Sequence, residues 1–446
     1  MGRDSTAKPN VARMSARERS RFGLAILLVA VATASFAIAF RGALSFVFDL
    51  TAGVPNVVAA LQRAPVALRL VLPAVGGLLA GVLGLWIARK PAGHGVDDVM
   101  EAVVLGRVHL SMRVTLMKSL ASWLAIASGG SIGREGPLIQ FGGAAGKVIS
   151  DRLALSQDRA RILIAAGTAA GFAAAYNTPL AAVLFVLEVV AGVVVLDTMV
   201  PTLVATVAAT ALTRAVVGAG PIYGQRTFVL HSDLELVAFA GLAIVAAVVS
   251  QAFMRLLSIG KKAFHRSALP LPWRPALGGL LAGAIVAFLP EVAGNGYEPL
   301  DAVLSARFTA GFIAVLLVGK ALATTASVSS GSPGGVFTPV LLLGGGTGFL
   351  YATALQYLGM NIGPAGGYAL VGMAATVAAT THAPLMAAVM AFELSGDYAI
   401  VLPLILVTAV STAISRKLRS DSIYTAELRD RGISWELTME GRKVVE

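Results

Sequence analysis

Cysteine is absent from this sequence of 446 residues, and charged residues are scarce, at 13% against about 25% in soluble domains. The absence of cysteine excludes disulfides and thiolate metal sites. Because 57% of the residues are hydrophobic, a soluble fold of this size could not bury its apolar surface. The sequence also contains no His-Glu-x-x-His motif, and we expect no intramembrane hydrolase or other enzyme, no cofactor and no metal site.

Long stretches without any Asp, Glu, Lys or Arg predict an all-α, multi-pass membrane protein. About 20 apolar residues suffice to cross a bilayer, and each uncharged stretch is about that long or longer. We expect the cell (inner) membrane as the location. The stretches are residues 22–40, 70–88, 162–187, 236–254, 321–392 and 398–415.

The formal net charge of +11 would suggest nucleic acid as the partner of a soluble protein. In a membrane protein, basic residues gather in cytoplasmic loops, so we expect the lipid bilayer and no nucleic acid. Residues 1–21 are basic and polar and are followed by an apolar stretch that is too long for a cleavable signal peptide. This segment is therefore predicted to lie in the cytoplasm.

Glycine, in contrast, is abundant, with 48 residues, and many of them lie beside Ser, Thr or Pro in apolar segments. The runs 128–133 and 329–335 cannot form uninterrupted helix. Non-helical backbone at membrane depth is tolerated only where it is buried in protein or lines a polar cavity. These runs of broken helix are therefore candidate substrate sites.

The chain repeats itself. Residues 73–81 (PAVGGLLAG) recur as 275–283 (PALGGLLAG), 202 residues later, and several unusual residues keep the same register. These pairs are Lys118 and Lys320, Gly133 and Gly335, Pro137 and Pro339, and, with a slightly longer offset, Pro179 and Pro384, and Glu188 and Glu393. The sequence is therefore predicted to be a duplication.

Loop charges indicate that the two copies have opposite orientations. The segment 89–118 is rich in Arg and Lys, whereas the matching segment 290–307 carries three acidic residues and one Arg. The first is expected on the cytoplasmic side and the second outside, which predicts an inverted-topology repeat of broken and tilted helices with its site near the midplane. The expected parts are a cytoplasmic segment 1–21, repeats 22–230 and 231–420, and a cytoplasmic tail 421–446, with both termini inside.

Three predicted helix starts are candidate anion sites. They are residues 93–96, 133–137 and 335–339, because a helix N-terminus presents unpaired N–H groups and a partial positive charge. Glu135, with Gly133, Arg134 and Gly136 beside it, is an ionisable residue inside the membrane and hence a functional candidate. The alternative role for Glu135 is a salt bridge to Arg134 or to a loop cation. A cation transporter would instead need unwound carbonyls and paired carboxylates.

Several motifs resemble those of the CLC chloride channels and transporters. They are Gly-Arg-Glu-Gly-Pro at 133–137, Gly-Val-Phe-Thr-Pro at 335–339, Asn-Thr-Pro-Leu at 177–180 and Ser-Ile-Tyr-Thr at 422–425. The resemblance implies a homodimer with one anion pathway per subunit, in a bacterial member without the nucleotide-sensing domains of many relatives. It implies that Glu135 is the gate. It also implies that the N–H groups of Val336 and Phe337 and the Tyr424 hydroxyl surround a central anion. The candidate anion-binding residues are Gly93, His94, Gly95, Val96, Gly133, Arg134, Gly136, Gly335, Val336, Phe337 and Tyr424.

Two departures from the family pattern bear on mechanism. His94 stands where the family has a serine that touches the anion, and its imidazole could donate to the anion or point away. Val189 stands where proton-coupled members have a glutamate. We therefore expect passive, channel-like conduction of a small inorganic anion, most simply chloride. The alternatives are a proton-coupled antiporter, or a relative selective for fluoride, nitrate or bicarbonate.

Overall fold

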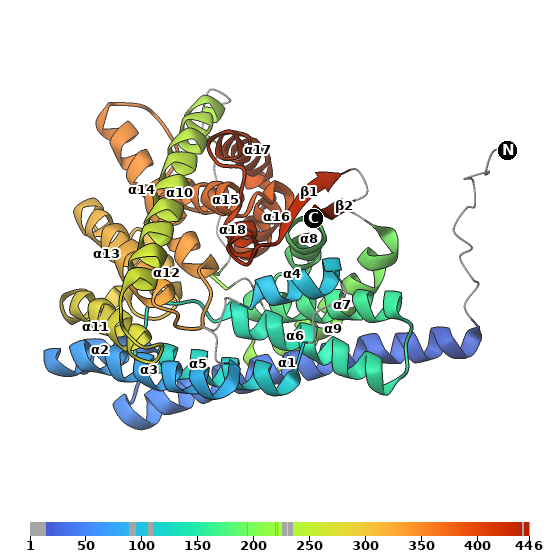
Figure 1. Ribbon diagram of the computed structural model, residues 1–446. Coiled ribbons are helices and arrows are strands. Elements are labelled where there is room, and N and C mark those ends of the chain that lie inside the picture. The colour runs from blue at the N-terminus through green and yellow to red at the C-terminus, as the bar shows by residue number, and fades with distance from the viewer. Residues whose placement is uncertain are drawn as a thin grey trace.

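The computed structural model describes residues 15–88, 95–105, 110–193, 195–218, 220, 222–224, 230, 235–438 and 441–445. Helices of very different length and tilt make up its body (Figure 1). The predicted site residues Gly93 and His94, residues 1–14 of the predicted N-terminal segment and parts of the loop 89–118 lie outside the described residues.

The helices follow one another with short connections in both halves of the chain. The first half contains α1 (Ala16–Ala52), α2 (Val57–Arg63), α3 (Val66–Ala88), α4 (Val96–Leu105), α5 (Met112–Ala127), α6 (Glu135–Arg152), α7 (Gln157–Tyr176), α8 (Pro179–Leu184), the π-helical turn η1 (Phe185–Ala191) and α9 (Leu196–Val217).

The second half contains α10 (Glu235–Arg266), α11 (Trp273–Phe288), the short 3₁₀ turn η2 (Pro290–Val292), α12 (Tyr297–Leu304), α13 (Ala310–Ser329), α14 (Phe337–Tyr357), α15 (Ala365–Thr381), α16 (Pro384–Ser395), the 3₁₀ turn η3 (Tyr398–Ile400), α17 (Val401–Leu418) and α18 (Ile423–Asp430). Strands β1 (Ser434–Thr438) and β2 (Gly441–Val445) follow.

Seven helical segments in the described part of the chain are long and apolar enough to span a membrane. They carry many exposed large apolar side chains, among them Leu24, Val75, Val207, Ile244 and Val315, which suits a lipid-facing surface. Helix α1 begins earlier than the predicted start at residue 22, because Ser15 and Glu18 form a capping box. The stretch 162–187 is broken at residues 177–178, between α7 and α8.

The order of helices in the first half recurs in the second, which confirms the predicted inverted repeat. Helices α3 to α9 correspond in order to α11 to α17, with α8 and η1 together in the place of α16. Even the backbone of the breaks agrees, because Asn177 after α7 and His382 after α15 both adopt left-handed φ values, of 57° and 59°. The pairing of Asn177 with His382 explains His382 as a repeat position rather than a catalytic base.

The two repeats are packed together through α3 and α11. Gly77 of α3 lies against the backbone of Pro275, and its repeat mate Gly279 of α11 lies against the backbone of Pro73. A Cβ atom at either glycine would overlap the carbonyl oxygen of that proline. The duplicated Pro-Ala-x-Gly-Gly segments therefore form a surface on which the backbones of the two halves approach closely.

The C-terminal segment adds the strands that the all-helical prediction did not include. β1 pairs with β2 in an antiparallel hairpin, from Ser434 opposite Val445 to Thr438 opposite Gly441. Helix α18 and this hairpin lie next to α4 (Figure 1). The end of the chain is therefore packed onto the membrane body.

We predict that Gly279→Ala lowers the thermal midpoint of the purified protein in detergent, because the added methyl group must displace the backbone of α3. Overpacking of this kind costs about 1–3 kcal/mol. Gly84→Ala, on α3 with no atom within 4 Å of an added Cβ, is the matched control and should leave the midpoint unchanged or slightly higher. Equal midpoints for the two variants would contradict this packing.

Candidate anion site

Two helix starts from opposite repeats face each other at the centre of the molecule. Helix α6 begins at Glu135 and α14 begins at Phe337. The residues before them form an antiparallel bridge, in which Gly133 N–H donates to Gly335 O (2.7 Å) and Gly335 N–H donates to Gly133 O (2.9 Å). The N–H groups of Gly133 and Gly335, two of the predicted anion-binding residues, are therefore engaged with each other in this structure.

The Glu135 carboxylate is bound at the start of α14. Its Oε1 accepts from the N–H groups of Phe337 (2.8 Å) and Thr338 (3.4 Å), and its Oε2 accepts from the Thr338 hydroxyl (3.1 Å). Glu135 is only 1% exposed. A negative group thus occupies the positive end of a helix, as an inorganic anion would.

The alternative role of Glu135 as the salt-bridge partner of Arg134 is not what the structure shows. The Arg134 guanidinium lies over the ring of Tyr297, 4.7 Å from its centroid. This cation–π contact stabilises the guanidinium without the carboxylate. Arg134 therefore contributes its backbone position before α6, while its side chain points to another element.

The bridge glycines make room for the carboxylate. A Cβ atom at Gly133 or at Gly335 would overlap the carboxyl oxygens of Glu135. Both positions must lack a side chain for Glu135 to reach the start of α14. Glycine is thus required at both positions because a side chain there would collide with the carboxylate, whereas the bridge itself uses only backbone groups.

Sequence reasoning missed a second layer of polar groups behind Glu135. The Thr338 hydroxyl, which donates to Glu135, lies 2.9 Å from the hydroxyl of Tyr176. Tyr176 is 1% exposed and is the last residue of α7. Its position directly before the break at Asn177 is the signal that could have identified it, since residues at broken helix ends line membrane sites.

The third predicted helix start adjoins the first. Gly95 has a left-handed φ of 86° and precedes α4. An added Cβ at Gly95 would lie 3.0 Å from both the Gly136 carbonyl and the Gln140 side chain of α6. The start of α4, with Val96 only 1% exposed, is therefore packed against the first turn of α6.

Tyr424 joins the same region from the other end of the chain. It lies in the first turn of α18, which is capped by Ser422, and is 5% exposed. Its ring meets Phe185 edge-on, with centroids 6.0 Å apart. Phe185 stacks on Phe172, which in turn contacts Phe337 edge-on at 5.4 Å. A continuous aromatic cluster thus connects Tyr424 with the start of α14.

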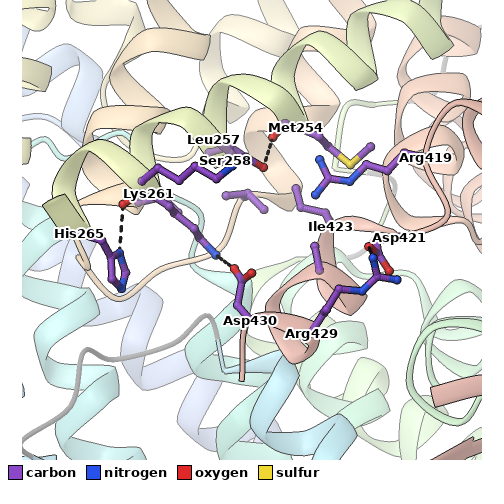
Figure 2. Close-up of a pocket in the computed structure, with 14 residues that line it drawn as sticks. Met254, Leu257, Ser258, Lys261, His265, Arg419, Asp421, Ile423, Arg429 and Asp430 are labelled. Carbon is purple, nitrogen blue, oxygen red and sulfur yellow. Dashed lines mark hydrogen bonds and ion pairs between the residues drawn. The ribbon is translucent and has the colours of Figure 1, made fainter. Parts of the chain in front are cut away.

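A cavity of about 510 Å³ opens between α10 and α18 and reaches Val336, the residue before α14 (Figure 2). Its wall is basic, although Lys261 pairs with Glu427 and Asp430 and Arg429 pairs with Asp421. Apolar side chains such as Leu257 and Ile423 complete it. The charged side chains of the wall are Lys261, Lys262, Arg419, Asp421, Arg429 and Asp430.

Glu188 has the structural role that its repeat mate suggests. Its carboxylate accepts from the N–H groups of Leu385 (3.2 Å) and Met386 (2.7 Å) at the start of α16. Glu393 does the same for Leu180 (2.9 Å) and Ala181 (2.8 Å) at the start of α8. The two carboxylates therefore cap each other's repeat. The neighbouring Val189 is 1% exposed, within η1.

Comparison with known proteins agrees with this architecture. Residues 76–416 match the family model of voltage gated chloride channels. The chain is 40% identical over 411 residues to a ClcB-like chloride channel protein of Ralstonia nicotianae, covering 90% of this chain and 95% of the relative. It is 36% identical over 369 residues to the voltage-gated ClC-type chloride channel ClcB of Citrobacter koseri, covering 80% and 86% of the two chains.

Solved structures with the same fold include a slow cyanobacterial Cl⁻/H⁺ antiporter, with a TM-score of 0.80 and 25% identity over 94% of this chain and 98% of the other. A CLC-type fluoride/proton antiporter has a TM-score of 0.76 and 22% identity, over 92% and 98%. The broken helices meet in an inverted repeat, as in these solved structures. The family model and the curated relatives match most of the chain and indicate the same family. The chain belongs to the voltage-gated chloride channel (CLC) family and is a multi-pass membrane protein that transports anions.

Proposed function

We propose that the protein conducts chloride passively and that Glu135 is its gate. The observation that carries this proposal is the carboxylate of Glu135 at the start of α14, held by two backbone N–H groups and a hydroxyl. These neutral donors would also hold a dehydrated chloride ion. Binding by neutral donors is weak enough to allow release, which conduction requires.

In this mechanism Glu135 and the anion compete for the same donors. When the side chain leaves the start of α14, or takes up a proton and loses its charge, the N–H groups of Phe337 and Thr338 become available to chloride. Val336 and Tyr424 complete the central site. The start of α4 provides a further binding position for the anion, formed by Gly95 and Val96 together with Gly93 and His94.

The basic cavity between α10 and α18 is the proposed way in from the cytoplasm. It reaches Val336, and its cations raise the local concentration of anions at the entrance. A volume of about 510 Å³ admits a hydrated chloride ion, since one water occupies about 30 Å³ in the liquid. Chloride would lose its water only at the start of α14.

Two further parts of the proposal concern assembly and placement. We propose a homodimer in which each subunit has its own pathway, with both termini on the cytoplasmic side. The parts of the chain are residues 1–21, 22–230, 231–420 and 421–446. The orientation is supported by the basic residues on both sides of the connection between α10 and α11, among them Lys261 and Lys262 near the end of α10 and Arg274 at the start of α11.

A proton-coupled antiporter is the second candidate, and it has specific support. A solved structure with the same fold at 25% identity is that of a Cl⁻/H⁺ antiporter, and Glu135 is a group that can carry a proton. Against it, Val189 cannot relay a proton towards the cytoplasm, and Glu188 is engaged in capping α16. The curated relatives carry the name of channels.

Glu135→Gln is expected to raise chloride efflux from proteoliposomes and to remove its dependence on pH. The neutral amide competes poorly with chloride, because a hydrogen bond to a charged group is worth about 1.5–3 kcal/mol, which corresponds to an increase of about tenfold or more. A correctly folded variant with the flux and pH response of the parent would refute the gate.

Thr338→Val should raise chloride flux at neutral pH severalfold, because valine has the shape of threonine and removes only the hydroxyl that donates to Glu135. Thr347→Val is the matched control. Thr347 is buried in the same helix and donates only to the Leu343 carbonyl of its own turn. If both variants behave alike, the Thr338 hydroxyl does not hold the gate.

An imposed chloride gradient should drive little proton movement in proteoliposomes, and the reversal potential should follow chloride alone. The measurement is proton uptake recorded with a pH electrode, with Glu188→Gln and His94→Ser beside the parent. Robust uphill proton movement by the parent would establish the antiporter instead. Its loss in one of the variants would then identify the relay.

A further inference from the structure

The first turns of α4 carry three carboxylates at a place where anions are proposed to pass. Asp97 and Asp98 follow Val96 directly, and Glu101 lies one turn further along. Asp97 is only 1% exposed. Carboxylates stabilise a helix N-terminus, but they oppose the approach of a second negative charge to the same helix end.

Arg431, at the far end of the chain, reaches all three carboxylates. It follows α18 directly. Its Nη2 pairs with Asp97, and its Nη1 lies 2.9 Å from Asp98 Oδ1 and 3.4 Å from Glu101 Oε2. The planar guanidinium can serve several oxygens at once and remains charged at every accessible pH.

Two further contacts of the cluster come from neighbouring helices. Lys118 of α5 pairs with Asp98 Oδ2 at 2.6 Å, and Gln140 of α6 donates to the same oxygen at 2.8 Å. Among the described residues, these three carboxylates are thus contacted by two cations, and Arg431 is the one that pairs with the buried Asp97. Without Arg431, the three carboxylates would lose a positive charge that contacts all of them.

We propose that Arg431 determines how readily anions pass the start of α4, by neutralising the carboxylates of that helix. This inference rests on the proposed function, because it requires α4 to lie on the anion pathway. It gives the C-terminal segment a part in transport beyond the Tyr424 side chain. The same arginine holds α18, and hence Tyr424, against α4.

The test uses chloride efflux from proteoliposomes that contain the full-length protein. Arg431→Gln should reduce the flux about tenfold, since charges a few ångströms apart interact strongly at a partly buried site. Arg431→Lys should keep most of the flux. Raising the ionic strength with sodium gluconate should narrow the deficit of Arg431→Gln, because salt screens partly exposed charges.

Asp97→Asn separates a charge effect from a merely structural one. Alone, it should raise the flux above that of the parent, and combined with Arg431→Gln it should restore most of the lost flux. Lys147→Gln removes an ion pair with Asp151 at the far end of α6 and should transport like the parent. Gel filtration and thermal midpoints show which variants fold. If Arg431→Gln does not fold, the test rests on Asp97→Asn alone.

The inference is overturned if Asp97→Asn leaves the flux unchanged or reduced, or if the double variant is no better than Arg431→Gln. Glu135→Gln, measured in the same series, keeps this failure distinct from failure of the proposed function. If the parent transports chloride and Glu135→Gln responds as expected, the proposed function stands whatever Arg431 does. A folded parent without chloride flux would overturn both.

Discussion

The hydrogen bonds between the Glu135 carboxylate and the start of α14 meet a general requirement, which is that buried backbone N–H groups need an acceptor. A helix that begins inside a membrane exposes N–H groups that no water can satisfy. At α14 the acceptor is a side chain from the other repeat. The bridge between Gly133 and Gly335 fixes the distance between the two helix starts, and the lack of side chains at both glycines lets the carboxylate pass between them.

The same constraint is met elsewhere in ways that hold the fold together. Glu188 caps α16 and Glu393 caps α8, so each repeat satisfies a helix start of the other. The buried Lys320 Nζ donates to the carbonyls of Val292 and Gly294, before α12. Its repeat mate Lys118 instead meets the carboxylate of Asp98. Equivalent lysines in the two repeats thus bind different partners, which are backbone carbonyls in the second repeat and a carboxylate in the first.

Much of this arrangement could be predicted from the sequence, because duplication repeats unusual residues in a fixed register. Glycine and proline at 133–137 and 335–339 located two helix starts correctly, and the acidic pair Glu188 and Glu393 indicated a structural role. Helix breaks at matching positions followed from the same register. These features depend on local backbone preferences, which single residues report directly.

Contacts between distant segments could not be predicted in this way. Nothing in the register shows that Gly133 and Gly335 pair with each other through their backbones. The contact of Arg431 with Asp97 joins residues from opposite ends of the chain. The Tyr176 hydroxyl behind Thr338 depends on how α7 and α14 pack. Such contacts follow from tertiary packing, which no periodicity in one sequence specifies.

The register of the repeat also explains why the site is asymmetric. Glu135 and Phe337 occupy equivalent positions, and the carboxylate of the first accepts a hydrogen bond from the backbone of the second. The site therefore lies at the approximate symmetry axis that relates the repeats. A carboxylate at both positions would bring two negative charges together at one place, which strongly disfavours ionisation of one of them. An inverted duplication can keep its symmetry in helix packing, as at Gly77 and Gly279, but it must lose that symmetry where a single carboxylate occupies the helix start of the other repeat.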